Sequence, residues 1–242
     1  MQQVIKFFLD LLFPISCLGC GKTDTWFCQQ CFDQIQINRG TDDHVLKLPG
    51  FLDQIWAVSD YRQENLTKVL HQFKYRFVVA LGEVLGQLLV NFLKPKVEEQ
   101  KLSFDVVVPV PLAKRRLKKR GFNQSEVMAR FLNRNFGWPV RTDLIFRIRH
   151  HQPQVGLHAE ARRQNVKGIF KTQNNYLIQG KTILLVDDVV TTGSTLSECA
   201  KVLKQAGAKF VFGLVVAKAD VNDQWGSGQN RSDLVDYWGI LF

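Results

Sequence analysis

The segment Ile183-Leu-Leu-Val-Asp-Asp-Val-Val-Thr-Thr-Gly-Ser-Thr195 most constrains how this 242-residue chain can fold. Four apolar residues lead into two adjacent carboxylates, and a loop rich in hydroxyls and glycine follows them. A helical pattern of apolar residues then runs from Leu196 to Ala206. This order predicts a buried strand, a tight turn and a helix, which together form the repeating unit of α/β sheets.

The residue types in this segment predict a phosphorylated sugar as ligand. Backbone N–H groups at a helix N-terminus lack intrahelical partners and carry partial positive charge, so they bind phosphate. Gly193 lets the backbone approach the ligand closely, and the four loop hydroxyls donate to phosphate oxygens. Asp187 and Asp188 follow the predicted strand at its carboxyl end, where open α/β sheets bind ligands, and carboxylates accept hydrogen bonds from ribose hydroxyls. An ordinary capped turn would explain one hydroxyl but not this whole set.

Leu185–Thr195 resembles the phosphoribosyl pyrophosphate (PRPP) motif of type I phosphoribosyltransferases. In that family the paired acids bind the ribose hydroxyls and the loop holds the 5-phosphate. The resemblance implies Mg²⁺ on the pyrophosphate of PRPP, and it makes Asp187 and Asp188 the catalytic residues of any transfer. It implies a PRPP site formed by Asp187, Asp188, Val189, Val190, Thr191, Thr192, Gly193, Ser194 and Thr195.

Positive charge is concentrated in one part of the chain. Residues 101–171 hold 16 Lys/Arg and 4 Asp/Glu, a net charge of +12, whereas each flanking segment carries −1. Six of these bases fall in the seven residues 114–120, directly after a strand predicted over 104–111. A solvated charged face would explain an average run, but this one lies at the predicted ligand edge and favours a polyanion. Contacts with pyrophosphate or single-stranded DNA are therefore expected from Lys114, Arg115, Arg116, Lys118, Lys119 and Arg120.

Two Cys-x-x-Cys pairs, separated by seven residues, lie near the N-terminus. Four thiolates in two paired turns suit tetrahedral zinc. Two disulfides would require an exported protein, and a redox pair would need only one such motif. We expect a structural zinc because protein ligands fill all four positions, and because so short a fragment needs metal to fold. Its ligands are predicted to be Cys17, Cys20, Cys28 and Cys31.

The first 14 residues predict an amphipathic helix rather than a signal peptide. Apolar residues at 4, 7, 8, 11 and 12 fit one helix face, and Lys6 and Asp10 interrupt the run. Membrane contact is expected to be peripheral at most, because no segment approaches the roughly 18 apolar residues of a spanning helix. A cytoplasmic location follows as an expectation. The segment 149–168 is predicted to be a loop that acts as a lid.

Alternating strands and helices predict a parallel sheet flanked by helices, the type I phosphoribosyltransferase-like fold implied by the motif. We expect a small module over 1–45, with the amphipathic helix and the zinc site, and an α/β domain over 46–242. A helix is predicted over 65–93, with a break near 75–79 and an end at Pro95, and another over 124–135. Further strands are predicted over 52–61, 141–147 and 210–217.

Several further motifs together resemble the ComF family, in an order that covers nearly the whole chain. They are the four cysteines, Lys74-Tyr75, Val108-Pro-Val-Pro-Leu112 with Arg115, Arg120-Gly-Phe-Asn-Gln124, Gln152-Pro-Gln154, Leu157, Arg162, Asn165, Gly168-Ile-Phe170 and the Asp187–Thr195 loop. The resemblance implies natural competence and DNA uptake, with imported single-stranded DNA as ligand and a competence helicase as partner.

Three functions are compatible with these patterns. The first is a PRPP-binding protein of DNA uptake, in which any transfer would pass through an oxocarbenium-like ribose stabilised by carboxylate charge. The second is an adaptor that binds DNA or the helicase without chemistry, because a fold does not determine a function. The third is nucleobase salvage, which the lack of a recognisable nucleobase-binding hood disfavours. The motif thus predicts a ligand and leaves the reaction open.

Overall fold

The computed structural model of this chain describes residues 15–38, 50–148 and 167–220. The amphipathic helix predicted over 1–14, the boundary expected at residue 45 and nearly all of the predicted lid lie outside these ranges. Within them, no helix is long and apolar enough to cross a lipid bilayer.

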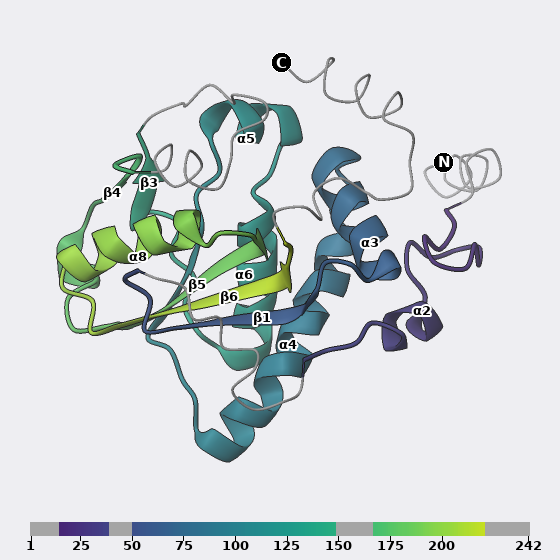
Figure 1. Cartoon of the computed structure of the whole chain (residues 1–242), viewed down its shortest axis with the longest axis horizontal. Helices are drawn as coiled ribbons and strands as arrows, with labels where there is room; N and C mark the ends of the chain where they lie inside the picture. Colours follow the sequence, from purple (N-terminus) through teal and green to yellow (C-terminus); the bar gives the residue numbers. More distant parts are fainter. Residues whose placement is uncertain (1–14, 39–49, 149–166, 221–242) are drawn as a thin grey trace, which may run out of the picture.

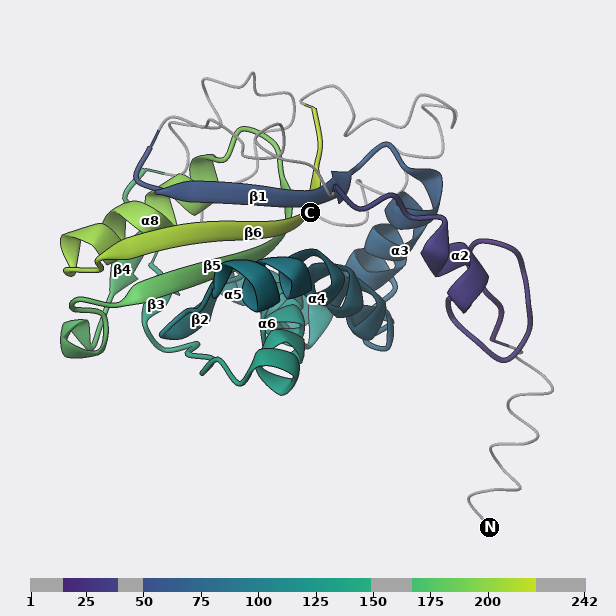
Figure 2. The same ribbon diagram turned by 90° about the horizontal axis from the view of Figure 1, so that it is seen from below.

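Four parallel strands form the central sheet in the order β1 (Gln54–Asp60), β6 (Phe210–Lys218), β5 (Thr182–Val190) and β2 (Val106–Pro109) (Figures 1 and 2). The two central strands, β5 and β6, are apolar on both faces, as expected of a parallel sheet covered on both sides. The expected parallel sheet is therefore confirmed.

Helices cover both faces of this sheet (Figure 1). One face packs against α3 (Glu64–Tyr75), α4 (Leu81–Gln100) and α6 (Gln124–Phe136). The other packs against α8 (Ser194–Gln205) and a small antiparallel sheet of two strands, β3 (Ile145–Arg147) and β4 (Phe170–Thr172). The short η2 (Asn175–Leu177) follows β4. The two faces thus bury two separate apolar clusters.

Strand β2 is shorter than its neighbour β5, and this difference positions the site. The last paired residue of β2, Pro109, lies opposite Val186, and the N–H of Val110 donates to the Val186 carbonyl at 3.0 Å. Pro111 has no N–H and cannot extend the pairing. The last four residues of β5, Asp187–Val190, consequently have a strand neighbour, β6, on one side, while helix α6 packs against β5.

Two predicted elements differ in the structure. Helix α4 continues through Pro95 to Gln100, because Pro95 and Asn91 are both exposed and water can satisfy the Asn91 carbonyl that loses its helical donor. The strand predicted over 141–147 shortens to β3 and pairs outside the main sheet. The break expected near 75–79 is confirmed, since α3 ends at Tyr75 and α4 begins at Leu81.

The cysteine module (residues 15–38) packs against the edge of the sheet and the start of α3. After its short helix α2 (Gln29–Asp33), the chain runs alongside β1. There the Asn38 N–H donates to the Val58 carbonyl at 2.8 Å. The Gln36 N–H donates to Gln63 Oε1 at 2.7 Å, immediately before α3. Cys31 and Ile35 belong to the same apolar cluster as α3. The module is therefore bound to the helix that reaches the site.

Candidate functional site

The loop after β5 has the geometry that its sequence predicts. Gly193 adopts a φ of 73°, in the left-handed region, and precedes the first residue of α8. The hydroxyls of Thr192 and Ser194 lie 2.7 Å apart. The loop therefore places hydroxyls and the N-terminus of a twelve-residue helix beside the carboxyl end of β5. This arrangement suits a bound phosphate.

The paired acids lie within the last residues of β5, not beyond it. Oδ1 of Asp187 accepts hydrogen bonds from Ser125 Oγ and from the Asp188 N–H, both at 2.9 Å. Burial raises the pKa of Asp187 to about 7, and the negative charge of Asp188 adds to the effect. The pKa of Asp187 therefore lies well above that of an ordinary aspartate.

Asp188 has a different partner, the ammonium of Lys74 at the end of α3. Lys74 Nζ lies 2.9 Å from Asp188 Oδ1. Burial by itself lowers the pKa of Lys74, but the Asp188 carboxylate outweighs this effect, so the pKa lies above its ordinary value. Lys74 therefore stays charged at the site.

The Arg120–Gln124 motif connects the basic run to the acids. The basic run forms α5 (Lys114–Arg120), which ends at Gly121 in the left-handed region. Asn123 caps α6 by accepting from the Ser125 N–H at 3.2 Å, and its side chain donates to the Val110 carbonyl at 3.0 Å. Arg120 donates to Gln124 Oε1 at 3.0 Å and stacks over the ring of Tyr75. The motif thereby presents Ser125 to Asp187.

Helix α5 places its bases unequally. Arg120 is partly buried against Tyr75, and burial lowers its pKa, an effect that the nearby Asp188 opposes. The remaining bases of α5 are exposed, and no residue of this helix is buried: Lys114, Arg115, Arg116, Lys118 and Lys119. Of the six predicted contact residues, the structure brings Arg120 into the neighbourhood of the acids and leaves the others on the surface.

Four residues of this site were not predicted to act there: Lys74, Tyr75, Gln124 and Ser125. The first three belong to the ComF-like motifs, so the sequence marked them as family residues but did not indicate what they contact. Their contacts join α3, α6 and β5, which are distant in sequence. Only the folded sheet reveals these contacts.

The four cysteines of the module converge on one point. Their Sγ atoms all lie within 4.8 Å of one another, and tetrahedral Zn–S bonds would separate them by about 3.8 Å. Gly21, at a φ of 77°, forms the turn, and a Cβ at Gly19 would lie 2.5 Å from Cys31 Sγ. The Cys28 N–H donates to Cys17 Sγ at 3.3 Å, which favours a thiolate there. The cluster could therefore hold a metal ion.

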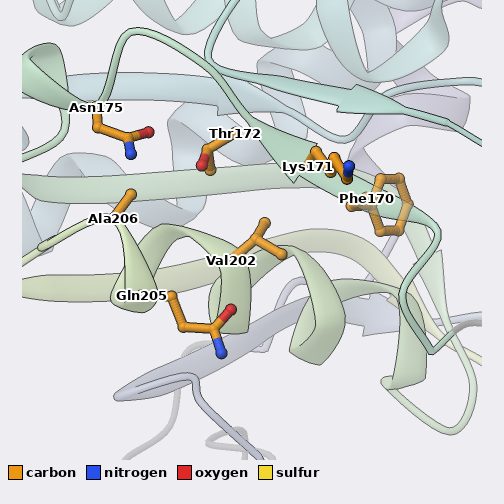
Figure 3. A pocket seen from close by; sticks show the side chains of 7 residues that line it. All are labelled: Phe170, Lys171, Thr172, Asn175, Val202, Gln205 and Ala206. Atoms are coloured by element: carbon orange, nitrogen blue, oxygen red, sulfur yellow. The ribbon is translucent and has the colours of Figure 1, made fainter.

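A surface pocket of about 350 Å³ lies away from this site, between β4, η2 and the C-terminal half of α8 (Figure 3). Val202 and Gln205 line it, at least two helical turns beyond Ser194. Its lining includes one base, Lys171, and no acid. The described phosphate loop and this pocket are therefore separate features.

Comparison with known proteins gives a consistent family. The model of the phosphoribosyl transferase domain matches residues 96–227. Competence protein F of Haemophilus influenzae is 30% identical over 199 residues, covering 80% of this chain and 86% of that protein. The DNA utilization protein YhgH of Escherichia coli O157:H7 is 32% identical over 196 residues, covering 81% and 85%.

A third relative comes from another bacterium. Competence protein ComFC of Bacillus subtilis is 29% identical over 193 residues, covering 79% of this chain and 72% of that protein. The domain match over residues 96–227 includes strands β2, β5 and β6 and the Thr191–Thr195 loop, and the four close cysteines precede it in the chain. The chain belongs to the ComF family of proteins with a phosphoribosyltransferase domain.

Proposed function

We propose that this chain binds PRPP with the 5-phosphate on the Thr191–Thr195 loop and the ribose hydroxyls on Asp187 and Asp188. One observation carries the proposal: the paired acids and the N-terminus of α8 lie together at the carboxyl end of β5, beyond the last residue that pairs with β2. Carboxylates accept from hydroxyls, and helix N-termini bind phosphate. The site thus matches the two ends of a phosphorylated ribose.

Mg²⁺ bound to the pyrophosphate would neutralise part of its charge, and carboxylate oxygens are ligands that this ion prefers. In a transfer reaction, Asp187 and Asp188 would hold the ribose and stabilise positive charge that develops on it. Arg120 is the base of α5 with the shortest route to the leaving pyrophosphate, since it lies near Asp188. These roles describe a pentosyl transfer whose acceptor the site does not specify.

Zinc is the ion that we propose for the cysteine cluster. Four thiolates with no open position define a structural site rather than a catalytic one. The module, proposed to extend to about residue 45, would depend on this ion for its stability.

The names of the relatives, competence proteins and DNA utilization proteins, support a role in DNA uptake. Helix α5 supports single-stranded DNA as a partner, because five of its bases are exposed on a helix that buries no residue. A competence helicase as partner and a cytoplasmic location, with membrane contact at most peripheral, complete the proposal. The exposed helix also favours the second candidate, an adaptor that binds DNA without chemistry.

Isothermal titration with PRPP and Mg²⁺ tests the first proposal. The wild type should bind, and an Asp187→Asn/Asp188→Asn variant should bind at least about tenfold more weakly, because two charged acceptors are lost. Equal binding by both proteins would refute the site. Wild-type protein that binds single-stranded DNA but neither PRPP nor ribose 5-phosphate would instead identify the adaptor.

A further inference from the structure

Lys74 lies inside the site, although nothing in the sequence of the loop identifies it. Its side chain is 19% exposed and that of Asp188 is 15% exposed, while Nζ and Oδ1 lie 2.9 Å apart. Water screens such a pair less than it screens surface pairs, so the attraction is stronger. The pair is therefore a built part of the site rather than a chance surface contact.

The helix around Lys74 is fixed on several sides. Phe73 packs against Phe122 with ring centres 5.3 Å apart, and Tyr75 lies beneath Arg120 with 5.6 Å between the guanidinium carbon and the ring centre. The start of α3 is joined to the cysteine module, since Gln63 Nε2 donates to the Gln36 carbonyl at 2.9 Å. These contacts hold the end of α3, and with it the backbone of Lys74, beside Asp188.

The two acids are unlike because of these contacts. Asp187 accepts from two neutral donors, whereas Asp188 meets a cation. Besides Asp187, the charged and titratable groups that act on or near Asp188 within the described residues come from three parts of the chain. They are Tyr61 after β1, Lys74 and Tyr75 on α3, and Arg120 on α5. Lys74 is the cation in direct contact with Asp188.

We propose that Lys74 is a positioning residue of the phosphoribosyl site, orienting the Asp188 carboxylate and balancing the charge of the acid pair. This role rests on the proposed PRPP function. The contact occupies one donor of the ammonium, and a carboxylate has about four acceptor sites, so Asp188 can still accept from ribose hydroxyls. Lys74 thereby orients the Asp188 carboxylate and leaves acceptor sites on it for the ribose hydroxyls. Loss of the cation leaves two carboxylates adjacent and unbalanced, and such a pair resists ionisation.

The test compares Lys74→Met with Lys74→Arg, and uses Lys68→Met as a matched control. Lys68 stands on the same helix but is exposed and paired with Glu64 at 2.7 Å. Titrations with PRPP and with ribose 5-phosphate are made between pH 5.5 and 8.5. Lys74→Met should bind both ligands about tenfold more weakly at pH 7, because both use the ribose contact, and Lys74→Arg should recover part of the loss. Lys68→Met should bind like the wild type.

The pH profile separates positioning from general damage to the fold. Without Lys74 the acid pair should take up its proton at higher pH, so the acid limb of ligand binding should move upward. A purely structural defect would lower affinity by the same factor at every pH, and that result would overturn the role of Lys74. Unchanged binding by Lys74→Met would also overturn it while leaving the PRPP site intact. Failure of the wild type to bind either ligand would refute the proposed function itself.

Discussion

Replacement of Asp187 by Asn should make the ligand-free protein more stable at pH 8 than the wild type. Burial and the adjacent Asp188 raise the pKa of Asp187 from 3.8 to about 7. An acid whose folded pKa is raised destabilises the fold once pH exceeds its unfolded pKa, because the unfolded state then gives up the proton more easily. The cost grows between about pH 4 and pH 7 and is complete above that range.

The magnitude follows from the size of the shift. The rise of the Asp187 pKa from 3.8 to about 7 corresponds to at most roughly 4 kcal/mol. Asn removes the charge, and its Oδ1 can keep the hydrogen bonds from Ser125 and from the Asp188 N–H. We expect a gain of about 2–4 kcal/mol at pH 8, which for a domain of this size raises the melting temperature by about 4–16 °C. At pH 5, about one unit above the unfolded pKa, the gain should fall to less than about half of its value at pH 8.

Thermal and urea unfolding of both proteins at pH 5 and pH 8, without ligand, measures this effect. The quantity of interest is the difference between variant and wild type, because burial lowers the pKa of His71 and this group contributes the opposite trend to both proteins. A variant that is less stable than the wild type at pH 8, or equally shifted at both pH values, would refute the reasoning. The variant should at the same time bind PRPP more weakly, since stability and binding oppose each other here.

Three further outcomes are expected. Ser125→Ala removes the 2.9 Å hydrogen bond to the first acid of the pair and should raise the apparent pKa of PRPP binding, measured by titration across pH; an unchanged profile would contradict the contact. Gly19→Ala places a Cβ 2.5 Å from Cys31 Sγ, so zinc content by elemental analysis should fall below one per chain, and full occupancy would contradict the packing. Lys118→Gln/Lys119→Gln should reduce the salt dependence of single-stranded DNA binding by a slope of about 1.4, with PRPP affinity unchanged. An unaltered slope would remove α5 from the DNA surface.

Sequence patterns correctly predicted the elements that are determined by a few neighbouring residues. The apolar run ending at Asp187, the glycine at position 193 and the cysteine spacing each specify a strand, a turn or a cluster within a few residues. The parallel sheet follows because such units have few ways to pack. Pro95 misled the prediction because the cost of a helix proline depends on whether water reaches the freed carbonyl, and only the fold decides that exposure.

The residues that contact the two acids could be identified only from the three-dimensional structure. Lys74 ends a helix that is unremarkable by composition, and Ser125 resembles any residue that begins a helix. Their roles depend on the approach of α3 and α6 to the end of β5, which brings Lys74 to Asp188 and Ser125 to Asp187. Periodicity describes one element at a time and contains no information about this approach. The sequence therefore predicted the paired acids and the Thr191–Thr195 loop. It did not predict that Lys74 pairs with Asp188 or that Ser125 donates to Asp187.

The short strand β2 also has a consequence for the behaviour of the protein in solution. A strand that extends past its neighbour presents backbone groups to which another chain can pair, and such edges favour aggregation. Here α6 packs against β5 next to the projecting residues, held by the Asn123 cap and its bond to the Val110 carbonyl. Helix α6, which supplies Ser125, therefore also restricts access of other chains to the unpaired backbone groups beside it. Variants that loosen the start of α6 should be recovered as aggregates as well as weak binders.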